Sequence, residues 1–125
     1  MIMTIQISEA EAQVMQVLWE RHPQTAEDVC AALAGQGWQD ATIKTLLNRL
    51  LNKAAISASK DGRRYLYAPL LAREDWLATE SQGFLDRMFN GRLAPLVAHF
   101  SQHKALSKAD IAELKKLVKE LENDK

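Results

Sequence analysis

Polar side chains of the kinds that bind DNA alternate with an apolar stripe between residues 40 and 54. The stripe recurs every three to four positions and predicts a helix with one buried face: Ile43, Leu46, Leu47, Leu50, Leu51 and Ala54. Asp40, a common N-cap residue, is expected to begin this helix. The opposite face carries short hydroxyls, amides and cations, which reach base edges and phosphates in a major groove. The candidate DNA-binding residues on this face are Thr42, Lys44, Thr45, Asn48 and Arg49.

A basic β-hairpin is expected directly after this helix. Strand-forming segments at 56–60 and 64–68 flank Asp61-Gly62, a pair that tolerates the positive φ of a tight turn. The cations near the tip suit a DNA backbone or a minor groove: Lys60, Arg63 and Arg64. A helix with a polar outer face followed by a basic hairpin is the layout of a winged helix-turn-helix.

The distribution of charge favours this interpretation, although the sum of charges does not. The chain of 125 residues holds 16 Lys and Arg and 16 Asp and Glu, so its formal net charge is zero. Residues 1–39 hold one cation and five anions, whereas residues 40–69 hold six cations and two anions. Phosphates respond to this local excess, because salt screens charges beyond about 8 Å. Accidental clustering on a solvated face is the alternative.

Two shorter helices are expected before the candidate recognition helix. Ser8 and Glu11, three residues apart, form a capping box that begins the first helix. Thr25 is expected to cap a second helix that ends near Ala34, and a glycine turn at 35–37 follows. Helix, short helix, turn, helix and hairpin is the winged-helix order, in which the first elements hold the third helix against DNA.

Three more helices are expected in residues 71–125, at 71–90, at 93–100 and after a capping box at Ser107 and Asp110. A segment of this size is marginal as an independent core, so we expect its apolar faces to pack against a second copy. The alternative is a monomer in which these helices fold back on the N-terminal domain. A two-fold dimer would present two recognition helices to a palindromic site. The candidate dimerisation residues are Leu85, Met88, Leu96, Val97, Phe100, Ile111, Leu114, Val118 and Leu121.

Composition excludes several other classes of protein. A chain with 47% apolar and 26% charged residues is typical of a globular protein, and no apolar run approaches the roughly 20 residues of a membrane span. The N-terminus lacks the features of a signal peptide. The single cysteine, Cys30, excludes an internal disulfide and fits a reducing compartment. We therefore expect a cytoplasmic protein that is not inserted in a membrane.

Sites for metal ions or catalysis have little support in the sequence. His99 and His103 are four positions apart, as in some zinc sites, but no glutamate lies between them as in a metalloprotease helix. An interaction of His99 with the carbonyls at a helix end is the simpler interpretation. Cys30 is expected to be a small core residue. Because no nucleophile–base set or phosphate-binding glycine loop is present, we expect neither an enzyme nor a cofactor.

Four segments that together span most of the chain carry a resemblance to a known family: ISEAEAQVMQVLW at 7–19, TIKTLLNRLLNKAAI at 42–56, GRRYLYAP at 62–69 and FLDRMFNGRLAPLVAHF at 84–100. The two middle segments are the most specific. The sequence resembles the penicillinase-repressor (BlaI/MecI) family, which includes the copper-responsive CopY branch.

The resemblance implies a homodimeric transcriptional repressor with a winged-helix domain, here residues 1–70, and a helical dimerisation domain, here residues 71–125. It implies that the third helix enters the major groove of a palindromic operator and that the wing touches the DNA backbone. Carried over by position, the helix contacts would be Thr42, Lys44, Thr45 and Arg49, and the wing contacts would be Lys60, Arg63 and Arg64.

The resemblance also implies an antibiotic response. Repressors of this family are inactivated through a membrane-bound zinc-protease sensor that responds to β-lactams, and the repressor is cleaved before a phenylalanine that matches Phe100. The corresponding bond here is His99-Phe100, where the family usually has asparagine before the phenylalanine. The glycine that often follows the third helix is Ala54 here, which is expected to remove the left-handed helix cap. The cysteine pairs that bind copper in the CopY branch are absent, so a copper sensor is not expected.

An alternative function uses the same fold without DNA. Winged helices also serve as protein-interaction modules, and Arg63 and Arg64 could bind an acidic partner protein. Binding to duplex DNA that weakens steeply with salt would favour the repressor, and a flat response would favour the interaction module.

Overall fold

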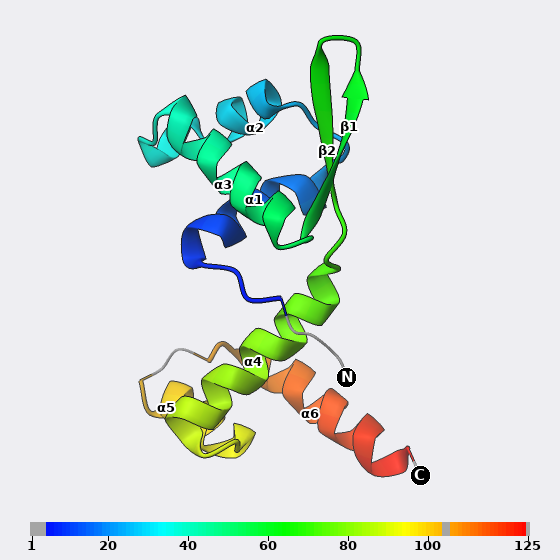
Figure 1. The fold of residues 1–125 in the computed structure, drawn as a ribbon. Helices are drawn as coiled ribbons and strands as arrows, with labels where there is room; N and C mark the ends of the chain where they lie inside the picture. Colours follow the sequence, from blue (N-terminus) through cyan, green and yellow to red (C-terminus); the bar gives the residue numbers. More distant parts are fainter. Residues whose placement is uncertain (1–4, 104–105, 125) are drawn as a thin grey trace. The chain divides into compact units, whose positions relative to one another are not determined.

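The computed structural model describes residues 5–103 and 106–124 (Figure 1). In chain order its elements are α1 (Glu9–Glu20), α2 (Ala26–Ala32), the short 3₁₀ helix η1 (Ala34–Gln36), α3 (Asp40–Asn52), β1 (Ile56–Asp61), β2 (Arg64–Pro69), α4 (Arg73–Phe89), α5 (Leu93–Gln102) and α6 (Lys108–Asn123). The chain divides into two compact units, an N-terminal unit of residues 1–79 and a C-terminal unit of residues 80–125. The predicted fold class, mainly helical with one small hairpin, is confirmed. Within the described ranges, no helix has both the length and the apolar composition that a bilayer span requires.

Helices α1 and α2 begin where the sequence predicted, because each has a complete capping box. In α1 the Ser8 hydroxyl accepts from the Glu11 N–H at 3.1 Å, and the Glu11 carboxylate accepts from the Ser8 N–H at 2.7 Å. Thr25 and Asp28 form the same pair of bonds at the start of α2. Each box satisfies backbone N–H groups that a helix start leaves without partners, so these boundaries are set locally.

The core of the N-terminal unit forms where the inner faces of α1, α2 and α3 meet the start of β1. Its side chains are at most 6% exposed: Val14, Met15, Leu18, Val29, Leu33, Ile43, Leu46, Leu47, Leu50, Ala55 and Ile56. Cys30 is partly buried against this cluster, as expected for a small core residue, and Trp38 packs there as well. Four residues of the predicted stripe in α3 are buried, so the opposite face of that helix is turned to solvent.

Both ends of α3 differ from the prediction. Asp40 is the first helical residue and not the cap; Gln39 occupies the cap position and makes no side-chain capping bond. At the other end Ala54 adopts a left-handed conformation with φ 61°, so the expected loss of the left-handed cap is wrong. Backbone bonds from Ala54 N to Leu51 O at 3.0 Å and from Ala55 N to Leu50 O at 2.9 Å close the helix. These bonds hold alanine in a conformation that usually favours glycine.

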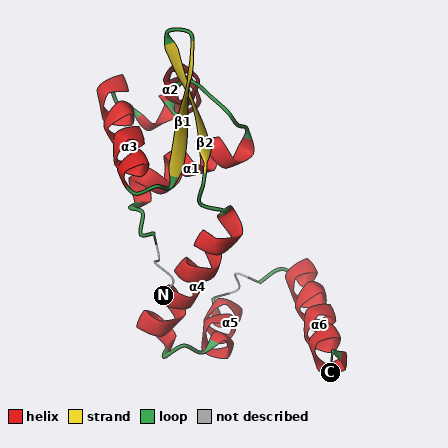
Figure 2. Cartoon of the chain, turned by 45° about the vertical axis from the view of Figure 1, so that its right-hand side comes forward, coloured by secondary structure: helices red, strands yellow, loops and turns green. Residues whose placement is uncertain are grey.

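The wing is an antiparallel pair, β1 and β2, that projects from the N-terminal unit (Figure 2). The register pairs Ile56 with Pro69 and Asp61 with Arg64, so each strand extends one residue beyond the prediction. The two-residue loop is therefore Gly62-Arg63, which lies within the turn predicted at 60–64, while Asp61 itself belongs to β1. Gly62 has φ 65°, which fits hairpin loops with glycine at the first position.

The first turns of α4 belong to the N-terminal unit. The Trp19 and Trp76 rings have centroids 5.4 Å apart, and Trp19 Nε1 donates to the Leu71 carbonyl at 2.9 Å. These contacts join α1 to the start of α4, so the division between the units falls within α4 after Thr79. The domain boundary expected after residue 70 stays a prediction about which segments fold independently.

The C-terminal unit contains the rest of α4 together with α5 and α6. Asn90 and Gly91, both left-handed with φ 52° and 78°, separate α4 from α5. Ser107 and Asp110 form the predicted capping box at the start of α6, with bonds of 3.0 and 3.2 Å. Along α4, α5 and α6 no described residue is buried. Their apolar faces therefore lack the cover that α1, α2 and α3 give one another.

Candidate nucleic-acid interface

The polar face of α3 is presented to solvent. All five residues predicted to bind DNA from this helix are exposed: Thr42, Lys44, Thr45, Asn48 and Arg49. The Thr45 hydroxyl donates to the Ala41 carbonyl at 3.0 Å, which leaves its oxygen lone pairs free to accept. The buried stripe thus fixes which side of α3 faces outward, and that side holds both cations and hydrogen-bonding groups.

A small hollow joins α3 to the wing. It is about 180 Å³ in volume and its wall includes Lys44 of α3, Arg63 and Arg64 of the wing, and Tyr65 and Tyr67 of β2. The start of α2 completes the wall and adds one carboxylate, that of Glu27, beside the three cations. Three of the predicted cations, which are up to 20 positions apart in sequence, therefore line one concave surface. Convergent cations and hydroxyls suit a phosphate oxygen, which accepts from both.

The other predicted wing cation lies outside this hollow. Lys60 is exposed on β1, where it pairs with Tyr65 across the two strands. Arg64 is 3.6 Å from the carboxylate of Asp61, and both side chains are more than half exposed. An exposed pair of this kind is weak, so it leaves the Arg64 guanidinium available to a stronger anion.

At the start of α2, backbone and side-chain hydrogen bonds from Thr25 hold the pKa of Asp28 below its usual value.

Lys53 differs from the other cations of residues 40–69 because its partner is a buried carboxylate. Its Nζ lies 2.6 Å from Glu11 Oε1 in a salt bridge in which the Glu11 side chain is 2% exposed. Burial alone would raise the pKa of Glu11, but the bonds from Lys53 and Ser8 outweigh burial and hold this pKa below its usual value. The sequence prediction assigned Glu11 only a role in the capping box and counted Lys53 as a free charge. No local pattern could have found this pair, because its members are 42 positions apart.

The other candidate residues have ordinary environments. Burial, with a contribution from Asp40, raises the pKa of the Cys30 thiol, which makes that thiol less reactive. His99 and His103 lie on one exposed side of α5 with ring centroids 4.5 Å apart. In the described parts of the chain, no three side chains of the His, Cys, Asp and Glu types gather as metal ligands would.

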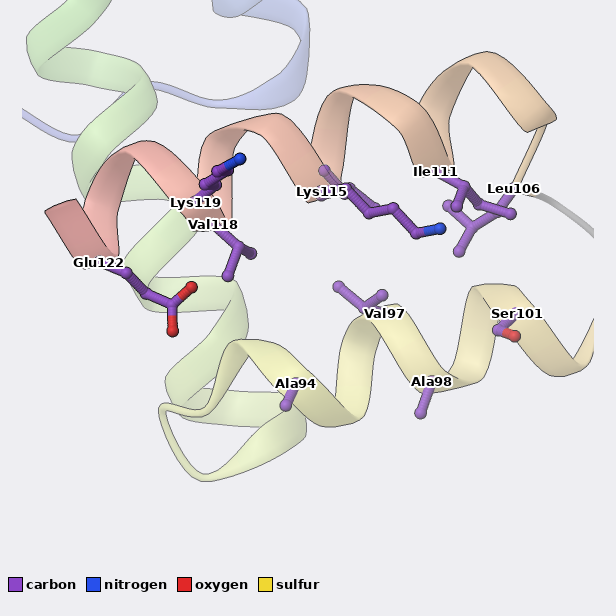
Figure 3. A pocket seen from close by; sticks show the side chains of 11 residues that line it. Ala94, Val97, Ala98, Ser101, Leu106, Ile111, Lys115, Val118, Lys119 and Glu122 are labelled. Atoms are coloured by element: carbon purple, nitrogen blue, oxygen red, sulfur yellow. The ribbon is translucent and has the colours of Figure 1, made fainter.

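The predicted dimerisation residues all lie in the C-terminal unit and are half-buried or exposed. The exposed fraction reaches 62% at Met88, 53% at Val118 and 71% at Leu121. A groove of about 810 Å³ runs between α5 and α6. Val97 points from α5 toward α6 across this groove, and Val118 lies on the opposite wall (Figure 3).

Comparison with known proteins identifies the family. The family model described as penicillinase repressor matches residues 7–120. The chain belongs to the penicillinase repressor family. A penicillinase repressor from Bacillus licheniformis is 36% identical over 121 residues, which cover 96% of this chain and 94% of the relative. The methicillin resistance regulatory protein MecI of Staphylococcus aureus strain N315 is 30% identical over 116 residues, which cover 92% of this chain and 94% of MecI.

One related repressor has been solved in complex with DNA. It is the solution structure of monomeric Bacillus licheniformis BlaI in complex with the blaP half-operator, and it is 36% identical to this chain. The match covers 58% of this chain and 90% of the BlaI chain, with a TM-score of 0.51. The predicted family and the winged-helix fold are therefore confirmed. The individual DNA contacts stay predictions.

Proposed function

We propose that this protein is a DNA-binding transcriptional repressor that acts as a homodimer on a palindromic operator. The observation that carries the proposal is the shared surface of α3 and the wing, where Lys44, Arg63 and Arg64 line one hollow beside an exposed polar helix face. The relationship to repressors, one of them solved with a half-operator, supports the same function. These relatives are regulators, and the function proposed here involves no catalysis.

In this proposal α3 lies in the major groove and reads the sequence. Thr42, Lys44, Thr45, Asn48 and Arg49 would make the base and phosphate contacts from its outer face. Arg49 and Lys44 suit guanine acceptors, whereas Asn48 suits adenine. The wing cations Lys60, Arg63 and Arg64 would bind the sugar-phosphate backbone, which fixes orientation without reading sequence.

Dimerisation would involve the C-terminal unit. Its helices expose apolar side chains that water disfavours, and a second copy would cover them. The residues proposed for this interface are Leu85, Met88, Leu96, Val97, Phe100, Ile111, Leu114, Val118 and Leu121. A dimer would place two α3 helices on the two halves of a palindrome, so that each copy binds one half-site.

We also propose how repression ends. The family resemblance suggests that a membrane-bound zinc-protease sensor responds to a β-lactam and that the repressor is then cleaved at the His99-Phe100 bond in the cytoplasm. Both residues are exposed, and the bond lies within the last turns of α5. Proteases bind an extended backbone, so cleavage would require the end of α5 to unwind.

A DNA titration tests the proposed function. The protein would be titrated with duplex DNA from upstream of its own gene at 50 and 200 mM salt, with a scrambled duplex as the control. A dimer that places roughly 6–10 cations on phosphates should lose about 10³–10⁵ in affinity between these salt concentrations. Selective binding with this salt dependence supports the repressor. Binding that is weak, non-selective and insensitive to salt would contradict it and favour a protein-interaction module.

A further inference from the structure

An ion pair between a buried carboxylate and a lysine that is 38% exposed joins the start of α1 to the end of α3. Glu11 Oε1 accepts from Lys53 Nζ at 2.6 Å and from the Ser8 N–H at 2.7 Å. The carboxylate is 2% exposed, so it makes no contact with a ligand on the surface. Short charge-assisted bonds to a buried group have a narrow preferred geometry, in contrast to apolar contacts, which are non-directional.

The pair acts on the part of α3 that carries Arg49. Lys53 is the C-cap of the helix, and its N–H donates to the Arg49 carbonyl at 3.0 Å. The start of the helix has no side-chain cap. Of the salt bridges among the described residues, the one between Lys53 and Glu11 ties α3 to another element.

A small change in the direction of the α3 axis would cause a large displacement at the end of the helix. The helix contains 13 residues and is therefore about 20 Å long. A tilt of about 10° around its first turn would displace its last turn by about 3 Å, which is the length of a whole hydrogen bond. Base contacts need placement within roughly 0.5 Å. Phosphate contacts by flexible wing cations tolerate such a shift far better.

We propose that Glu11 is a positioning residue for operator recognition: through Lys53 it fixes the last turn of α3 and so places Arg49 for base contacts. The inference rests on the proposed DNA-binding function and deepens it. It assigns part of the sequence specificity to a buried carboxylate that does not touch DNA.

The variant Glu11→Gln isolates the ion pair. Glutamine also serves in capping boxes, so α1 keeps its start while the negative charge is lost. Affinity for the operator duplex is expected to fall about tenfold. This is roughly the factor by which one base contact favours the correct base over a wrong one. Affinity for a scrambled duplex should stay constant or rise slightly, because an anion has been removed. The measured quantity is the ratio of the two affinities, taken at a temperature where circular dichroism shows each variant fully folded.

Three further variants separate positioning from charge and from folding. Glu9→Gln removes the same charge from an exposed site in the first turn of α1, and the ratio should not change. Lys53→Arg keeps a cation for Glu11 and should keep the ratio. The double variant Glu11→Gln/Lys53→Met removes both charges, so that Lys53 is not left without its partner, and should lower the ratio as much as Glu11→Gln alone.

The outcomes distinguish this inference from the function on which it rests. If the unaltered protein selects the operator and the ratio falls only where the pair is broken, the positioning role is supported. If Glu11→Gln lowers the melting temperature but keeps the ratio, Glu11 is merely structural and the inference is overturned, while the repressor function stands. If the unaltered protein does not select the operator, the proposed function fails and the inference fails with it.

Discussion

The two units use the same amphipathic helix pattern with opposite results. Leu50, in the stripe of α3, is fully buried in the core of the N-terminal unit, whereas Leu121, in the stripe of α6, is 71% exposed. The N-terminal unit therefore completes its core within one chain, and the described C-terminal unit does not. Helical periodicity predicts that a face will be buried, but it does not identify the partner that buries it. The proposed dimer would account for the difference, because a second copy would cover the C-terminal apolar faces.

The largest effect is expected from a charge in the C-terminal apolar face. Leu114→Asp should convert a dimer to a monomer, because the carboxylate would be desolvated at the interface. Operator affinity should then fall by about 10²–10⁴, since two linked half-sites no longer act together. Sedimentation equilibrium and DNA titration measure the two effects. Ala112→Asp, on the exposed opposite side of α6, is the control. A Leu114→Asp variant that sediments like the unaltered protein would contradict this interface.

The second prediction compares alanine substitutions at Leu50 and at Leu121. Leu50→Ala should lower the free energy of unfolding of the N-terminal unit by about 2–5 kcal/mol, because it leaves a cavity in a closed core. Leu121→Ala should act only through dimerisation, so its effect on urea unfolding should grow with protein concentration. If Leu121→Ala lowered stability equally at all concentrations, the C-terminal unit would have a core of its own.

Within the N-terminal unit, α3 and the wing are expected to contribute differently to binding. Lys44→Ala should relax sequence preference at a cost of about 1–3 kcal/mol for the operator. Arg63→Gln should weaken binding to every duplex alike and lower the salt slope by roughly one for each protein copy. Titrations with operator and scrambled duplexes separate these effects. The assigned roles are wrong if Arg63→Gln changes sequence preference and Lys44→Ala does not.

The smallest expected effect is a gain in stability at the end of α3. Ala54 has φ 61°, a conformation that costs a residue with a side chain about 1–2 kcal/mol and costs glycine little. Ala54→Gly should therefore raise the free energy of unfolding by about 1 kcal/mol and leave operator selectivity unchanged. Ala55→Gly is the control, because Ala55 is buried and lacks a positive φ, so that change should destabilise. Urea unfolding of both variants checks the sign.

Local interactions explain which features the sequence could predict. The capping boxes at Ser8 and Ser107 involve residues three apart, and the structure forms both. The left-handed Ala54 could not be predicted, because backbone bonds of the helix end, and not the residue type, hold it there. The loop at Gly62-Arg63 depends on strand register, which the residue pair Asp61-Gly62 does not determine.

The exposure of the residues predicted to bind DNA from α3 could be predicted because it follows from the helical period. The pairing of Lys53 with Glu11 was missed, because only the packing of α1 on α3 brings these residues together. A count of charges along the sequence therefore overstated the cations that are free to bind phosphate.

The most direct test of the account is the mass of the complex with DNA. Native mass spectrometry of the full chain with the upstream duplex would count the copies bound at low protein concentration. We predict two chains of 14.1 kDa for each duplex, without a populated complex of one chain. A single bound chain at saturation, or equal binding to the scrambled duplex, would contradict the account of a dimeric operator-binding repressor.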